Sequence, residues 1–186
     1  MKILSLIHKF RESSKELTKL QSITVCAMML ALRVVLGALA NTGLTFLPYT
    51  KMSLNFLPVA IAAILYGPVC AMIVSGIGDI LSYLIVPIGG PYFPGWTLNA
   101  VLVGLLYGIF IYKTKRPLLN LIICEILIAL IIEIPLGSLW MYITYDKAFW
   151  LMAGTRGLKT LIATPIEIAV VYFFSKILKR IPNSRR

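Results

Sequence analysis

The sequence predicts an all-α protein: an integral membrane bundle of six transmembrane helices with both termini cytoplasmic. Apolar residues make up 59% of the 186-residue chain and charged residues 13%, whereas soluble domains contain about 25% charged residues. Because a helix needs roughly 20 mostly apolar residues to cross a bilayer, the chain has room for about six crossings and little else. The composition therefore excludes a cytoplasmic enzyme domain and a disordered chain.

The chain begins with an amphipathic leader, for which we take residues 1–19. Within it Ile3 and Ile7 lie one helical turn apart among basic residues, a pattern that suits the lipid headgroup boundary. A transmembrane domain follows over residues 20–178, and a basic tail occupies residues 179–186. We expect leader and tail to lie in the cytoplasm.

Six apolar runs build the transmembrane domain, separated by breaks of charge, proline or glycine. In chain order they cover residues 20–40, 52–66, 68–86, 95–112, 118–142 and 151–178. The second run has only fifteen residues and contains Pro58, which removes a helical hydrogen bond and favours a kink. We therefore expect this helix to be tilted, broken or partly buried by its neighbours.

The basic residues predict the orientation. Thirteen of the 18 Lys and Arg residues fall in segments 1–19, 113–116 and 176–186, which a six-span plan places on one side of the membrane. By the positive-inside rule this side is the cytoplasm. The net charge of +11 then reports topology and does not indicate nucleic-acid binding.

The sequence offers no reactive or metal-binding constellation. Cys26, Cys70 and Cys124 each lie inside an apolar run without ligand spacing, and we interpret them as buried small hydrophobic residues. The chain has no phosphate-binding loop, zinc-binding HExxH pair or GxSxG elbow. We therefore predict no catalytic residue, no metal site, no cofactor and no enzyme.

Ionisable residues inside the apolar runs are the candidates for a site. Each costs on the order of 3 kcal/mol at a helix centre, so each needs a partner, a water-filled cavity or a ligand. The helical rise predicts that five of them gather in the outer half of the membrane, namely Arg33, Asp79, Glu133, Arg156 and Lys159. Glu125 and Glu167 fall nearer the cytoplasm, where they would meet basic loops or another protein.

Two interpretations of the outer cluster remain open. Internal salt bridges would satisfy it, with Lys159 paired to Glu133 or Asp79. For Arg33 we favour a ligand, because a planar guanidinium suits a planar or carboxylate-bearing molecule. The excess of positive charge in this cluster predicts an anionic small molecule.

Two outer connections shape the predicted site. The segment PIGGPYFPGW (87–96) is predicted to be non-helical and stiff, and it holds Tyr92, Phe93 and Trp96. These aromatic residues are either interfacial anchors or, for Trp96, a surface for a flat heterocycle. The connection NTGLTFLPYTK (41–51) has the composition of a movable lid.

The runs AMMLALRVVLGAL (27–39) and KMSLNFLPVAIAAILYGPVCAMIVSGIGDILSYLIVPIGGPYFPGWTLNAVLVGLLYGIF (51–110) resemble the folate-type substrate-binding (S) component of energy-coupling factor (ECF) transporters. The resemblance implies a multi-pass protein of the bacterial cell membrane that captures folate outside and delivers it inward. It implies that Arg33 and Trp96 bind the pterin, and that Ala27 and Ala31 form an AxxxA motif that docks a coupling membrane subunit. ATP would be used only by two cytoplasmic ATPase partners. The depth argument adds Asp79, Tyr92, Phe93, Arg156 and Lys159 to the pocket.

Three alternatives stay open at this point. The first is an S component for another flat vitamin, such as riboflavin, a thiamin precursor or a queuosine precursor. The second is a membrane-embedded enzyme acting on lipid, with Asp79, Glu133 and Glu167 as acids or bases. The third is an assembly subunit without a small ligand.

Overall fold

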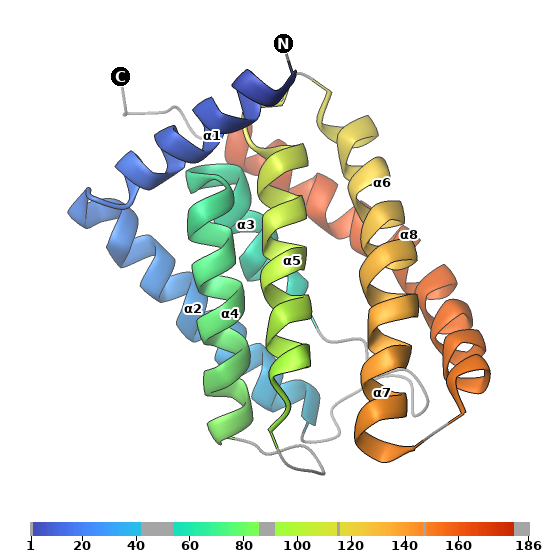
Figure 1. Ribbon diagram of the computed structural model, residues 1–186. Coiled ribbons are helices and arrows are strands. Elements are labelled where there is room, and N and C mark those ends of the chain that lie inside the picture. The colour runs from blue at the N-terminus through green and yellow to red at the C-terminus, as the bar shows by residue number, and fades with distance from the viewer. Residues whose placement is uncertain (1, 42–53, 86–91, 115, 147, 181–186) are drawn as a thin grey trace.

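The computed structural model describes residues 2–41, 54–85, 92–114, 116–146 and 148–180, and these residues contain helices and no strand. In chain order the helices are α1 (Lys2–Glu16), α2 (Leu20–Asn41), α3 (Phe56–Tyr66), α4 (Pro68–Ile85), α5 (Pro94–Ile111), α6 (Pro117–Leu127), the π-helix η1 (Ile128–Leu136), α7 (Gly137–Tyr145) and α8 (Phe149–Arg180). The predicted all-α bundle is confirmed. Figure 1 shows α1 lying across one end of the bundle, where α8 also ends.

Within the part of the chain that the structure describes, five segments are long and apolar enough to cross a membrane. Four of them lie in α2, α4, α5 and α8, and the fifth runs continuously through α6, η1 and α7. Pro135 lies within the π-helical part of this fifth segment, where the missing backbone N–H breaks the ordinary helical hydrogen-bond ladder. The six predicted runs therefore correspond to five full-length spans and the short helix α3.

Helix α3 is the buried centre of the bundle. It has 11 residues, and Val59, Ala60, Ala62 and Ala63 have no exposed surface. It packs against α2, α4, α5 and α8, so the expected partly buried helix is confirmed. The expected kink at Pro58 is wrong, because this proline lies in the first turn, where its missing N–H would have no intrahelical partner anyway.

Helices α4 and α5 approach each other closely because α5 carries glycines at the contact. A Cβ atom at Gly104 would lie 2.6 Å from the carbonyl oxygen of Ala71, and one at Gly108 would overlap Pro68. Only glycine fits at these two positions of the α4–α5 contact. Backbone packing of this kind is the usual way that helices associate in a membrane, where no hydrophobic driving force acts between them.

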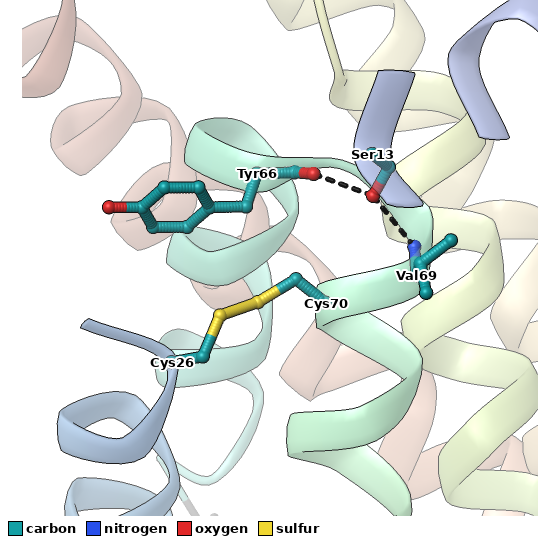
Figure 2. The surroundings of a disulfide bond; sticks show 5 residues. All are labelled: Ser13, Cys26, Tyr66, Val69 and Cys70. Atoms are coloured by element: carbon teal, nitrogen blue, oxygen red, sulfur yellow. Dashed lines mark hydrogen bonds between the residues drawn. A yellow bond between two sulfur atoms is a disulfide. The ribbon is translucent and has the colours of Figure 1, made fainter. Parts of the chain in front are cut away.

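The leader helix α1 is attached to the bundle by specific polar contacts. The Ser13 hydroxyl donates to the Tyr66 carbonyl oxygen (2.6 Å) and accepts from the Val69 amide (3.1 Å), as Figure 2 shows. The Tyr66 carbonyl lies at the end of α3 and the Val69 amide in the first turn of α4, where backbone groups bond to partners outside the helix. Lys113 donates to Glu12 across 2.9 Å, and this hydrogen bond lowers the pKa of Glu12 and raises that of Lys113.

Cys26 of α2 and Cys70 of α4 form a disulfide (Figure 2) with Cα atoms 6.7 Å apart. Both are buried as predicted, but the interpretation of three independent hydrophobic residues is wrong for this pair. The two cysteines are 44 residues apart, and only the packing of α2 on α4 brings them together. Cys124 is a buried free thiol.

The structure describes little of the two connections predicted to shape the site, residues 41–51 and 87–96. The segment 42–53, which holds most of the predicted lid, lies outside the described residues, as do residues 86–91. Pro94, Gly95 and Trp96 form the first turn of α5, so the prediction of a non-helical chain up to Trp96 is wrong. Proline is favoured at the first helical position because its fixed φ matches the helix.

Replacing Ser13 with alanine should destabilise the protein. Ser13→Ala removes the buried hydroxyl that bonds both the Tyr66 carbonyl and the Val69 amide, and losing buried hydrogen bonds of this kind costs about 1–3 kcal/mol. We expect the thermal midpoint in detergent to fall by several degrees, since about 1 kcal/mol corresponds to 2–4 °C in a chain of this size. The exposed neighbour Ser14 is the control, and equal midpoints for Ser13→Ala and Ser14→Ala would contradict this role.

Candidate functional site

A cavity of about 300 Å³ lies inside the bundle, enclosed by residues of α2, α3, α4, α5, α6, η1 and α8. The order of its lining residues along α5 and α8 divides it into three levels. The end that the predicted topology places toward the outside, called the outer end from here on, is polar, with Asn55, Asp79, Trp96, Asn99, Glu133, Arg156 and Lys159. The middle is mostly apolar, with Val59, Val103, Ile128 and Ala163, and the inner end is formed by Tyr107, Glu125 and Glu167.

Arg33 enters the cavity wall from α2 and is held by α4. Its side chain is buried, and Nη1 donates to the Ser75 hydroxyl across 3.0 Å. Ser75 in turn donates to the carbonyl oxygen of Ala100 on α5. Room for the arginine comes from Gly78, where a Cβ atom would lie 2.5 Å from Cδ and 2.9 Å from Nε. The guanidinium is therefore fixed in place before any ligand arrives.

Asp79 is connected to the first turn of α5. Its Oδ2 accepts from the Thr97 hydroxyl across 2.8 Å, and that hydroxyl also lies 2.6 Å from the Tyr92 hydroxyl. Asp79 additionally stabilises the charge of nearby Arg33. The predicted pairing of Asp79 with Lys159 is not among the ion pairs of the described residues, and the Asp79 carboxylate is bound by the Thr97 hydroxyl instead.

Arg156 covers the ring of Trp96 at the outer end of the cavity. Its Cζ lies 5.3 Å from the centroid of the Trp96 ring, and its Nη1 lies 3.7 Å from Oε2 of Glu133. A Cβ atom at Gly137 would lie 2.9 Å from Cζ of Arg156, so a glycine again leaves room for an arginine. Glu133 thus pairs with Arg156, and the predicted pairing of Glu133 with Lys159 is wrong.

The predicted binding residues fall into two groups. Arg33, Asp79, Trp96, Arg156 and Lys159 line the cavity together. Tyr92 and Phe93 stand beside it. Their rings contact those of Tyr83 and Trp140, with centroids 5.3 Å and 5.4 Å apart. A direct binding role for Tyr92 and Phe93 stays a prediction.

The sequence interpretation missed the inner end of the cavity. Glu125 and Glu167 were expected to face basic loops or another protein, but both line the cavity. The sequence does contain a spacing that points to the inner end of the cavity. Tyr107 comes eleven residues after Trp96, and Glu167 comes eleven residues after Arg156. Eleven residues are about three helical turns, so each pair shares one helix face.

The charge of the cavity also differs from expectation. Its lining contains three cations, Arg33, Arg156 and Lys159, and four carboxylates, Asp79, Glu125, Glu133 and Glu167. The predicted excess of positive charge is therefore wrong for the cavity as a whole, because the inner carboxylates were assigned elsewhere. The cations are confined to the middle and outer levels, which makes the cavity electrostatically two-ended.

Asn55 is a further lining residue that the sequence did not single out. Its Oδ1 is buried and has no hydrogen-bond partner within the described part of the chain. Asn99, by contrast, accepts from Trp140 Nε1 across 2.9 Å. A buried acceptor without a partner costs about 1–3 kcal/mol, so Asn55 is available to a polar ligand.

Ala27 and Ala31 are not among the residues that line the cavity and lie on the exposed face of α2. Both are exposed, as are the larger apolar neighbours Met28, Leu32 and Val35. Small residues four positions apart on an exposed apolar face allow another helix to approach closely. The face predicted to dock a partner is therefore open.

A family model and three curated relatives of this chain all point to the same family. Residues 21–175 match the family model described as ECF transporter, substrate-specific component. Three curated proteins named "Folate transporter FolT" are similar to the chain. The one from Clostridium novyi is 31% identical over 134 residues, covering 72% of this chain and 77% of the relative. The one from Leuconostoc mesenteroides is 30% identical over 153 residues, covering 79% and 80%. The one from Streptococcus mutans is 30% identical over 177 residues, covering 89% and 91%.

A solved structure described as "Crystal structure of FolT bound with folic acid" is also similar to this chain. The TM-score is 0.74 at 29% sequence identity, and the match covers 85% of this chain and 94% of the other. The likeness therefore extends over the whole bundle and is not confined to one pair of helices.

Replacing Gly78 with alanine should destabilise the protein through Arg33. The added methyl group would collide with the Arg33 side chain, and overpacking of this kind costs about 1–3 kcal/mol. We expect a lower thermal midpoint for Gly78→Ala and a much smaller decrease when Arg33→Ala is already present. Gly154, which has nothing within 4 Å of an added Cβ, is the control. Equal effects of Gly78→Ala in both backgrounds would contradict the contact.

Proposed function

Since this chain belongs to the substrate-specific component family of ECF transporters, we propose that it binds folate at the outer face of the membrane and delivers it inward. The observation that carries the proposal is the cavity that both buried Arg33 and aromatic Trp96 line. Its similarity to FolT, including a FolT structure with folic acid bound, supports folate over other flat vitamins.

The chemistry of folate matches this cavity part by part. Folate consists of a flat pterin, a benzoyl linker and a glutamate with two carboxylates. In our proposal the flat rings lie against Trp96 and Arg33, and stacking contributes about 0.5–1.5 kcal/mol beyond area burial. The glutamate carboxylates lie toward Arg156 and Lys159 at the outer end. Asn55 Oδ1, which lacks a partner among the described residues, accepts a hydrogen bond from the ligand.

We further propose that the chain acts with a coupling membrane subunit and two cytoplasmic ATPases. The sequence contains no ATP-binding motif, so energy must come from partners. The exposed Ala27 and Ala31 on α2 supply a face on which a helix of the coupling subunit fits.

We assign no catalytic role to the chain. Two of the three carboxylates that a lipid enzyme would use are already engaged, Asp79 by Thr97 and Glu133 by Arg156. Competition with folic acid by riboflavin, thiamin precursors and queuosine precursors tests the remaining alternatives within the family. We expect none of them to displace folic acid at comparable concentration.

Loss of either ring-binding residue should weaken folate binding. A charged hydrogen bond contributes about 1.5–3 kcal/mol, so we expect Arg33→Ala to lower the affinity for folic acid at least about tenfold, and Trp96→Ala by a similar or somewhat smaller factor. Arg33→Lys should not restore affinity fully, because an ammonium lacks the planar fork of guanidinium. The measurement is calorimetric titration of each purified variant.

The matched control for Trp96 is Trp150, which is 83% exposed and lies outside the cavity lining. Trp150→Ala should bind folic acid as the wild type does. Unchanged affinity in both Arg33→Ala and Trp96→Ala, with folded proteins, would remove the folate site from this region.

Bulky residues on the exposed face of α2 should separate uptake from binding. Leucine at both Ala27 and Ala31 prevents close helix approach, so we expect folate uptake by cells with the complete transporter to be abolished. Binding of folic acid to the isolated variant should stay nearly unchanged, because both alanines face away from the cavity. Ala169→Leu, at an exposed position of α8, is the control and should leave uptake intact. Loss of binding in the double variant would mean that the alanines support the fold instead.

A further inference from the structure

The inner end of the cavity is acidic and is ordered by one short hydrogen bond. The Tyr107 hydroxyl on α5 donates to Oε1 of Glu125 on α6 across 2.6 Å, and the two residues are 1% and 2% exposed. Glu167 of α8 lines the same end and is close enough to Glu125 to interact with it electrostatically. Three helices thus bring two carboxylates and a hydroxyl to one place inside the membrane.

Nothing in the described part of the chain neutralises Glu125. The four ion pairs between described residues involve neither Glu125 nor Glu167. Lys159 attracts Glu167 electrostatically. It lies eight residues before Glu167 on α8, however, which is about 12 Å of helical rise toward the outer end. A carboxylate has about four positions for hydrogen bonds, and Tyr107 occupies one of them. The site therefore has unused acceptor capacity in a place where unpaired polar groups are costly.

A carboxylate in this position selects for N–H donors. It accepts two parallel hydrogen bonds from a planar group that carries two adjacent N–H donors, as it does from a guanidinium. The amino-pyrimidinone edge of a pterin, with its exocyclic amine and its ring N–H, presents this arrangement. The carboxylates of a glutamate, by contrast, find no cation among the described residues of the inner end and are attracted by the cations at the outer end.

Resting on the proposed function, we propose that Glu125, oriented by Tyr107, is the specificity-determining residue for the amino-pyrimidinone edge of folate. The ligand then lies along the cavity with this edge inward, its pterin beside Arg33 and the apolar Val103 and Ile128, its benzoyl ring toward Trp96, and its glutamate outward. Glu167 reinforces the orientation by excluding a second anion from the inner end. Folates are thereby distinguished from flat anionic molecules that lack the paired donors.

The test compares two ligands on each purified protein by calorimetric titration. One ligand is folic acid, and the other is an analogue of folic acid in which a methyl group replaces the 2-amino group. Wild type should prefer folic acid by at least about tenfold, since hydrogen bonds to charged groups are among the stronger ones. Glu125→Gln should bind folic acid at least about tenfold more weakly but bind the analogue within about twofold of wild type. Tyr107→Phe should reduce the preference in the same direction by a smaller factor.

Controls separate recognition from folding. Glu16→Gln removes a carboxylate from α1, outside the cavity lining, and should leave both affinities and their ratio unchanged. A purely structural role of Glu125 would weaken both ligands equally, and that outcome would overturn the proposal. If Glu125→Gln does not fold, the proposal is still tested by the wild-type protein and by Tyr107→Phe. Equal affinity of the wild-type protein for the two ligands would by itself overturn the proposal. Failure of wild type to bind folic acid at all would instead overturn the proposed function itself.

Discussion

Every charge inside a membrane protein must be satisfied within the protein, and this constraint organises the whole structure. Lipid offers no hydrogen bonds, so an uncompensated charge at the centre of a helix is costly. The chain places seven ionisable side chains along one cavity, where they can face one another, water or a ligand. Arg33 is held by Ser75, Asp79 by Thr97, and Arg156 by Glu133 and the face of Trp96. The result is a polar interior surrounded by an apolar surface.

The backbone makes room for these side chains through its small residues. Gly78 and Gly137 each leave the space that one arginine fills. Gly104 and Gly108 bring α5 against α4, and the short helix α3 fills the centre where a full-length helix would occupy the cavity. Cavity shape and charge placement are therefore two consequences of the same packing.

The two ends of the bundle differ in how they are connected. At one end α1 lies across the helices, Ser13 pairs with the junction of α3 and α4, and the disulfide connects α2 to α4. At the opposite end polar side chains line the cavity, among them Asn99 of α5 and Arg156 and Lys159 of α8. A protein that receives a ligand on one side and meets its partners elsewhere needs such a difference. In the proposed function, the exposed alanines of α2 are the partner face, and a helix bound there leaves the cavity walls untouched.

The sequence by itself determined the fold class, the runs that became helices, and five of the residues that line the cavity. These features follow from hydropathy, helical spacing and the cost of a buried charge, all of which are read along one chain. For the fifteen-residue run around Pro58 it left a tilted, a broken and a partly buried helix open, and the structure shows the partly buried one. Arg33 and Trp96 were identifiable because each stands out from its apolar surroundings and matches a resemblance.

The tertiary structure alone decided which helices face one another, and with that the partner of each charge. Glu133 pairs with Arg156 and not with Lys159, Cys26 bonds to Cys70, and Glu125 meets Tyr107. Depth along a helix is fixed by the rise per residue, but the direction in which a side chain points depends on how that helix is rotated against its neighbours. That rotation is set by close contacts between helices, such as those at Gly104 and Gly78, and no spacing within a single helix determines it.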